Sequence, residues 1–174
     1  MFLAFIVLGV LLAMVFGVAA TRPDHFRIER SIAIAAPAAT VFAQLDNFHQ
    51  WAAWSPWGNL DPQLQRDYSG VAHGVGAVYQ WAGNRKTGSG RMEIIEATAP
   101  TRLRIKLDFL QPFAAHNLAD FSVLAEGDYS RVSWAMHGPS PLMARVMGLF
   151  FSMDKMLGAD FERGLASLKA CCEA

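Results

Sequence analysis

Residues 101–110, TRLRIKLDFL, decide the fold class of this chain. Apolar and charged side chains alternate along the segment, so an extended backbone would place them on opposite faces. The apolar set is Leu103, Ile105, Leu107 and Phe109, and the charged set is Arg102, Arg104, Lys106 and Asp108. This alternation predicts a β-strand with one buried and one solvated face, which needs a second layer to cover it.

Similar patterns of period two continue on both sides of this strand. We predict further strands over residues 26–35, 64–69, 76–83, 88–98, 115–125 and 129–138, the first with an out-of-pattern Arg30. Short turn signals such as Gly83-Asn84 and Ala99-Pro100 separate consecutive strands. Strands joined by short turns pair antiparallel, so the sequence predicts one antiparallel sheet of about seven strands.

Helical patterns stand at both ends of the sheet region. Pro37 begins a short helix, since proline suits the first helical turn. From Leu142 to Leu168 apolar residues recur every three or four positions, with a bend expected near Gly148 or Ser152. This long C-terminal helix is the expected cover for the sheet, so the predicted class is α+β.

Composition excludes several classes of protein. Fifteen basic residues balance fifteen acidic ones in a chain of 174 residues, so the electrostatic footprint expected of a nucleic-acid-binding protein is missing. The two cysteines, Cys171 and Cys172, are adjacent and give no disulfide framework, which fits a reducing compartment. We interpret them as small residues at a helix end, with a reactive or acylated thiol as the alternative.

Residues 1–20, MFLAFIVLGVLLAMVFGVAA, contain no charged residue. A helix of twenty residues is roughly 30 Å long, which matches the hydrocarbon core of a bilayer. We therefore predict a transmembrane anchor over residues 1–20. A cleaved signal peptide is the alternative, because Val18-Ala19-Ala20 resembles a cleavage site, but the segment lacks a basic beginning.

The charges after this segment predict its orientation. Arg22, Arg27 and Arg30 follow it and none precedes it, so the positive-inside rule places the remaining chain on the cytoplasmic side of an inner membrane. Residues 21–25 would be a short linker, and residues 26–174 one domain. The number of subunits is left open.

The chain resembles the SRPBCC, or START-like, helix-grip superfamily, in particular its polyketide cyclase/dehydratase and lipid-transport branch. The stretches that carry the resemblance are RSIAIAAPAATVFAQLDNFHQWAAWSPW (30–57), GVGAVYQWAGNRKTGSGRMEIIEATAPTRLRIKLDF (74–109) and MDKMLGADFERGLASLKA (153–170). The resemblance implies a curved sheet wrapped on the C-terminal helix. It also implies a cavity between them for a hydrophobic molecule such as a lipid, sterol, quinone or polyketide.

Catalytic patterns are sparse. The five histidines are scattered and distant from the cysteines, so we expect no metal, and phosphate loops and nucleophile elbows are missing, so we expect no cofactor. His116 and Asp120 would share one strand face and could act in acid–base chemistry, although a solvated outer face is the favoured interpretation. The polar candidates for a cavity are Tyr79, Glu93, His116, Asp120 and His137.

Apolar candidates for a binding site are more numerous. From the sheet, with Tyr79, they are Trp81, Met92, Ile94, Leu107, Phe109, Phe121, Trp134 and Met136. From the long helix they are Met153, Met156 and Leu157. Ordinary core packing would need the same residues, because ligand pockets are themselves mostly apolar.

The function predicted from these features is a membrane-anchored binding protein for a hydrophobic small molecule. One alternative is an enzyme of the polyketide cyclase/dehydratase type. Another is a protein-interaction module with a filled core that binds a partner through the tryptophan-rich stretch at 51–57.

Overall fold

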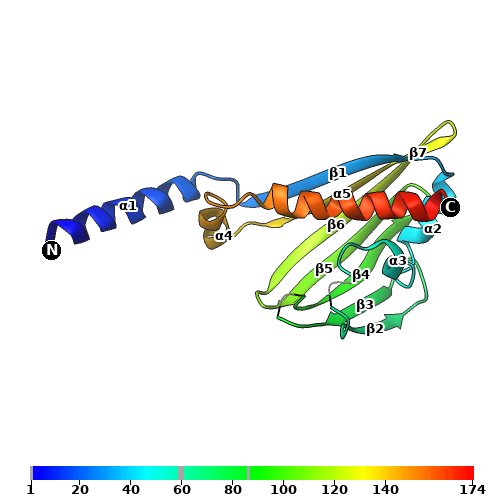
Figure 1. Ribbon diagram of the computed structural model, residues 1–174, viewed down its shortest axis with the longest axis horizontal. Helices are drawn as coiled ribbons and strands as arrows, with labels where there is room; N and C mark the ends of the chain where they lie inside the picture. Colours follow the sequence, from blue (N-terminus) through cyan, green and yellow to red (C-terminus); the bar gives the residue numbers. More distant parts are fainter. Residues whose placement is uncertain (1, 59–60, 86) are drawn as a thin grey trace.

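A computed structural model describes residues 2–58, 61–85 and 87–174 (Figure 1). The helices are α1 (Phe2–Ala20), α2 (Ala38–Leu45), α3 (Trp51–Trp54), α4 (Leu142–Met147) and α5 (Met153–Cys172). The strands are β1 (His25–Ile34), β2 (Gln65–Gly70), β3 (Ala77–Ala82), β4 (Ser89–Thr98), β5 (Arg102–Gln111), β6 (Ala115–Glu126) and β7 (Tyr129–Pro139).

All the described strands belong to one antiparallel seven-stranded sheet. Its order is β1-β7-β6-β5-β4-β3-β2, so each strand from β2 to β7 pairs with the next strand of the chain. β1 pairs with β7 and forms the edge of the sheet opposite β2. The sheet curves, and α5 lies across it (Figure 1). This arrangement fits the predicted helix-grip architecture.

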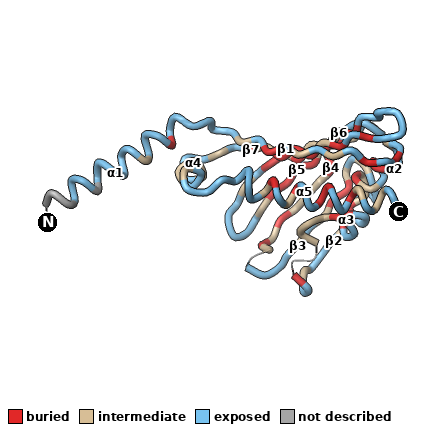
Figure 2. The backbone as a smooth tube through the Cα atoms, turned by 45° about the horizontal axis from the view of Figure 1, so that its top comes forward, coloured by how far each residue is buried: buried red, intermediate tan, exposed pale blue. Residues whose placement is uncertain are grey.

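The core lies between the concave face of the sheet and α5. Leu103 and Ile105 of β5 are fully buried, as their strand alternation predicts, and Phe161 and Leu168 bring the apolar face of α5 down onto the sheet. Burial follows the strands and one side of α5 (Figure 2). Apolar burial on this scale is the main favourable term in folding.

The C-terminal helical region is divided into two helices. α4 ends at Met147, and α5 starts again after Ser152, whose side-chain oxygen accepts a hydrogen bond of 3.2 Å from the backbone N–H of Lys155. Serine at this position satisfies one of the free N–H groups of a helix start. The expected bend is therefore a break, and only the second helix covers the sheet.

The tryptophan-rich stretch packs beneath α5. Gly164 makes this contact possible, because a Cβ atom at this position would lie 2.9 Å from Pro56 Cδ and 2.9 Å from Trp134 Cζ3. Phe161, one turn earlier, stacks on Trp134 with the two ring planes 3° apart and the centroids 4.2 Å apart. These contacts fix the stretch between the sheet and the helix.

The prediction of a transmembrane helix over residues 1–20 is wrong. A helix that crosses a bilayer needs about 20 consecutive apolar residues. Within the described ranges, no helix combines the length and the apolarity that crossing a membrane requires.

α1 instead extends away from the sheet beside α4 (Figure 1). Arg145 of α4 donates hydrogen bonds to the carbonyl oxygens of Ala20, at 3.3 Å, and Arg22, at 3.1 Å. The last carbonyl groups of a helix have no partner within it, and a basic side chain there is favourable. α4 therefore caps the end of α1 and fixes where α1 joins the domain.

Candidate functional site

A cavity of about 250 Å³ lies between the sheet, the tryptophan-rich stretch and α5. Its wall is built from the concave faces of β2 to β7, from residues 48–58 and from Leu157 and Phe161 of α5. Its volume falls just below the range of about 300–1,000 Å³ typical of sites for drug-sized molecules. A compact ligand fits such a space.

The sheet contributes an aromatic wall centred on Gly90. This glycine of β4 pairs with Trp81 of β3 on one side and Phe109 of β5 on the other. A side chain at position 90 would collide with the Trp81 ring, so glycine lets the indole lie across β4. The Trp81 and Phe109 rings then meet at 83°, with their centroids 5.9 Å apart.

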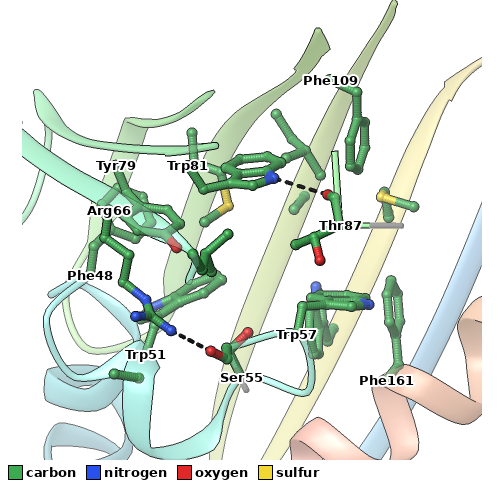
Figure 3. A pocket seen from close by; sticks show the side chains of 18 of the residues that line it. Phe48, Trp51, Ser55, Trp57, Arg66, Tyr79, Trp81, Thr87, Phe109 and Phe161 are labelled. Atoms are coloured by element: carbon green, nitrogen blue, oxygen red, sulfur yellow. Dashed lines mark hydrogen bonds between the residues drawn. The ribbon is translucent and has the colours of Figure 1, made fainter. Parts of the chain in front are cut away.

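The tryptophan-rich stretch contributes a second aromatic wall (Figure 3). Trp51 donates its indole N–H to the Leu45 carbonyl oxygen at 2.9 Å, and Trp57 donates to Asp160 of α5 at 3.2 Å. Both polar groups are therefore satisfied by the protein, while both residues line the cavity. Trp51 and Trp54 are almost fully buried, so they are not available as a surface for a protein partner.

The polar part of the wall is small. Ser55, Arg66, Tyr68, Tyr79 and Thr87 carry its polar side chains, and the described lining contains no Asp, Glu, His or Cys. Figure 3 shows Arg66 and Ser55 on one side of the cavity and Thr87 on the other. Burial raises the pKa of the Tyr79 hydroxyl, with a further increase from Tyr68, and nearby Arg66 partly opposes both effects. The Tyr79 phenol is therefore protonated at neutral pH and acts as a hydrogen-bond donor rather than as a base.

Eight of the twelve predicted site residues lie on the cavity wall: Tyr79, Trp81, Met92, Leu107, Phe109, Trp134, Met136 and Leu157. Ile94 and Phe121 are instead buried in the core, and Met153 and Met156 are exposed on α5. The two methionines lie in the first turn of α5, before the helix reaches its buried residues. That any of these residues contacts a ligand stays a prediction.

Sequence reasoning did not assign several wall residues to the site. They include Phe48, Trp51, Trp57, Leu64, Arg66, Tyr68 and Phe161. The alternation of Leu64, Arg66 and Tyr68 was a usable signal, because residues two apart on a strand share a face. Trp51, Trp54 and Trp57 recur every three residues, but only Trp51–Trp54 form a helix, of four residues, so only the tertiary structure shows where the three rings point.

The other polar candidates pair with neighbouring side chains and do not line the cavity. His116 Nδ1 lies 2.7 Å from Asp108, and Asp120 instead binds Arg104 at 2.7 Å and His137 at 2.9 Å. The pair of His116 and Asp120 that was considered for acid–base chemistry does not form. Glu93 is likewise paired, with Arg91 at 2.7 Å. In the described parts of the chain, no three His, Cys, Asp or Glu residues gather as a metal site would need.

A curved antiparallel sheet, a long helix across it and an apolar cavity between the two define a helix-grip protein. The family model for polyketide cyclase / dehydrase and lipid transport matches residues 25–173. The chain therefore belongs to that family, as its resemblance implied.

Solved structures share this fold at low sequence identity. Protein CV1439 from Chromobacterium violaceum is 13% identical with a TM-score of 0.60, and the match covers 88% of this chain and 99% of that one. The di-domain ARO/CYC BexL from the BE-7585A biosynthetic pathway is 18% identical with a TM-score of 0.63, over 90% of this chain and 53% of that one. A protein from Rhizobium leguminosarum is 12% identical with a TM-score of 0.62, over 86% and 95%. No curated protein matches the sequence.

Proposed function

We propose that this domain binds a compact hydrophobic small molecule in the cavity between the sheet and α5. The observation that carries the proposal is the cavity itself, because a filled core would leave no space of about 250 Å³ among aromatic side chains. An apolar cavity with a few polar groups is the usual form of a small-molecule site. The free energy of binding would come from burying apolar ligand surface, about 25 cal/mol per Å² before ordering costs.

The family and the structural neighbours support this proposal, since the family description includes lipid transport and cyclase chemistry, and one neighbour is described as an ARO/CYC protein. Catalysis is the second candidate, because Tyr79 and Arg66 bring polar groups to the wall. The described wall contains no carboxylate or imidazole to act as a general base. Binding is therefore the function that the geometry favours.

Native mass spectrometry of the purified full chain tests the proposal. A small molecule that remains bound in the gas phase and is released on denaturation would support it and would identify the ligand class. Incubating that compound with the protein and analysing the products would then test for cyclisation or dehydration. Bare protein after supplementation with a cell extract would contradict the binding proposal.

A pair of alanine substitutions on β6 supplies the matched control. Ala119 lines the cavity, and Ala119→Leu would fill part of it. Ala125 lies on the same strand and is exposed, so Ala125→Leu adds the same atoms outside the cavity. We expect ligand capture to fall with Ala119→Leu and to stay unchanged with Ala125→Leu. Equal capture by both variants would show that the ligand binds elsewhere.

A further inference from the structure

The cavity wall carries an uncompensated charge. Arg66 of β2 is the one charged residue in the described lining, which otherwise holds aromatic, aliphatic and hydroxyl side chains. Most other arginines of the domain are ion-paired, for example Arg104 with Asp120 and Arg131 with Glu126. Arg66 makes no ion pair with any residue that the structure describes. Its positive charge is therefore available to a ligand.

The position of Arg66 is set by the protein. Its Nη2 donates a hydrogen bond to the carbonyl oxygen of Gly58, which holds the guanidinium between β2 and the end of the tryptophan-rich stretch. Figure 3 shows the side chain extending toward Ser55 and Trp51 at one side of the cavity. The guanidinium also forms a side-chain hydrogen bond with Tyr79. It has five N–H groups, so these two bonds leave further donors for a ligand.

The polar groups around Arg66 are suited to an acceptor. Tyr79 is protonated because burial raises its pKa, and the ring of Tyr68, which also carries a hydroxyl group, lies 5.2 Å from the Tyr79 ring. Ser55 brings another hydroxyl group to the end of the Arg66 side chain (Figure 3). The indole N–H of Trp134 in the same wall has no acceptor among the described residues. A carboxylate only accepts hydrogen bonds and pairs with a guanidinium through two parallel bonds.

Access of solvent to Arg66 favours the binding of a charged ligand group beside it. Arg66 is exposed at the edge of the cavity, whereas Trp134 and Phe161 are buried. A charge that enters an apolar interior loses much of its hydration, but a carboxylate beside Arg66 would stay partly hydrated. The apolar part of the same molecule would lie against the aromatic wall.

We propose that the ligand is a compact amphiphile with one carboxylate, that Arg66 binds this carboxylate, and that the apolar body occupies the cavity. This inference rests on the proposed function and narrows it to a ligand class. Arg66 selects for the charge of the ligand, and the volume of about 250 Å³ selects against lipids with two long chains.

Three probes with the same ring system test the charge preference: 2-naphthoate, its neutral methyl ester and the cationic 2-naphthylmethylamine. Four tryptophans line the cavity, so quenching of their fluorescence and calorimetry both report binding. We expect the naphthoate to bind about 10- to 100-fold more tightly than the ester, as for other hydrogen bonds to charged groups. The amine should bind most weakly, and added salt should reduce the preference.

Substitutions at Arg66 separate its charge from its packing. Arg66→Met keeps the apolar stem, and we expect it to remove the preference for naphthoate while binding of the ester stays within about twofold. Arg66→Lys should keep part of the preference, because lysine retains the charge without the planar fork. Arg102→Met, at an exposed position outside the cavity wall, is the control for net charge and should change neither affinity.

The outcomes distinguish this inference from the proposed function. If the ester binds as tightly as the naphthoate, or if Arg66→Met weakens both probes equally, the carboxylate inference is wrong and the hydrophobic site stands. If no probe binds to the folded protein, the proposed function fails and the inference falls with it. Circular dichroism of Arg66→Met confirms that the variant is folded.

Discussion

Arg30 of β1 and Gly158 of α5 face each other so closely that a Cβ atom on Gly158 would collide with the Arg30 guanidinium. Within this contact Arg30 binds Asp154 at 3.0 Å and Glu162 at 2.8 Å, on either side of the glycine. These ion pairs raise the pKa of Arg30 and lower that of Asp154. An arginine that breaks the alternation of β1 is therefore one of the points where α5 is tied to the sheet edge, besides the hydrogen bond of Lys169 to the Ala33 carbonyl oxygen.

The Gly158→Ala variant tests this contact. Alanine is a better helix former than glycine by about 1 kcal/mol, but here its methyl group would displace Arg30 from its partners. We expect the substitution to give little or no stabilisation in the natural background. In an Arg30→Met background it should raise the free energy of unfolding by about 0.8–1 kcal/mol. Urea unfolding of the natural protein, the two single variants and the double variant gives the coupling energy between positions 30 and 158. Additive effects of the two substitutions would show that the two positions do not interact.

Gly90→Ala should damage both the fold and the cavity. The new methyl group would meet the Trp81 ring and, at 2.6 Å, the Asp108 carbonyl oxygen, and the backbone atom cannot move away cheaply. We expect a destabilisation of about 1–3 kcal/mol, with weaker binding of an apolar probe because Trp81 loses its place. Thr98→Ala at the exposed end of β4 is the control. If the apolar probe quenches tryptophan fluorescence in Gly90→Ala as strongly as in the natural protein, Gly90 is not needed to hold Trp81 in the cavity wall.

Asp120 gives the protein a defined acid sensitivity. Burial raises the pKa of its carboxyl, but hydrogen bonds from Arg104 and His137 outweigh it and lower the pKa below the ordinary value. A carboxyl with a lowered folded-state pKa stabilises the fold above its unfolded pKa of about 3.9, and that stability is lost as the pH falls through the folded value. Asp120→Asn should therefore reduce stability at pH 7 and flatten its decrease in acid.

Urea midpoints at about pH 7 and about pH 3 measure this effect. We expect Asp120→Asn to cost about 1–2 kcal/mol at neutral pH and much less in acid. Asp67→Asn is the matched control, since Asp67 is exposed and forms no ion pair among the described residues. A loss that is the same at both pH values would show that Asp120 acts through packing rather than charge.

Ser130 ties β7 to the chain before α2. It is fully buried, and its hydroxyl donates a hydrogen bond of 2.7 Å to the Ala36 carbonyl oxygen. Ser130→Ala leaves that oxygen without this donor, so we expect a loss of about 1–3 kcal/mol in the free energy of unfolding. Ser133→Ala on the same strand, with its side chain only partly buried, should change stability by less than about 0.5 kcal/mol. Equal effects would mean that the hydrogen bond contributes nothing specific.

Cys172 should react slowly in the folded protein. Burial, together with smaller effects of Cys171 and Glu173, raises the pKa of its thiol to about 11. At pH 8 an ordinary thiol is about one quarter thiolate, whereas Cys172 would be on the order of 0.1% thiolate. In a Cys171→Ser background we expect labelling by iodoacetamide on the order of 100-fold slower than in urea. Equal rates would show that the thiol is not protected.

Local patterns in the sequence were sufficient for the strands and for their order along the chain. The alternation of Leu103, Ile105, Leu107 and Phe109 predicted a strand with one buried face, and three of these four side chains are buried while Phe109 is half-buried. Turn signals predicted antiparallel neighbours, which the register of β4, β5 and β6 confirms. These features depend on residues close in sequence, so a pattern of period two contains them.

Local patterns also misled at two places. The helical period continues through residues 148–152, but Gly148 and the Ser152 cap separate α4 from α5. The apolar residues 1–20 predicted a transmembrane helix, and no helix in the described ranges meets the requirements for crossing a bilayer. Periodicity and hydropathy describe a segment alone, whereas helix ends and surroundings depend on caps and neighbouring elements.

The sequence by itself determined the α+β class, the strand alternation and the helical cover, because each follows from the period of apolar residues along the chain. Only the tertiary structure decided that Arg66 lies on the cavity wall, that Gly90 makes room for Trp81, and that Met153 and Met156 are exposed. A cavity is space left unfilled where residues distant in sequence meet. Its shape depends on strand register and on the volumes of facing side chains, which no single segment encodes.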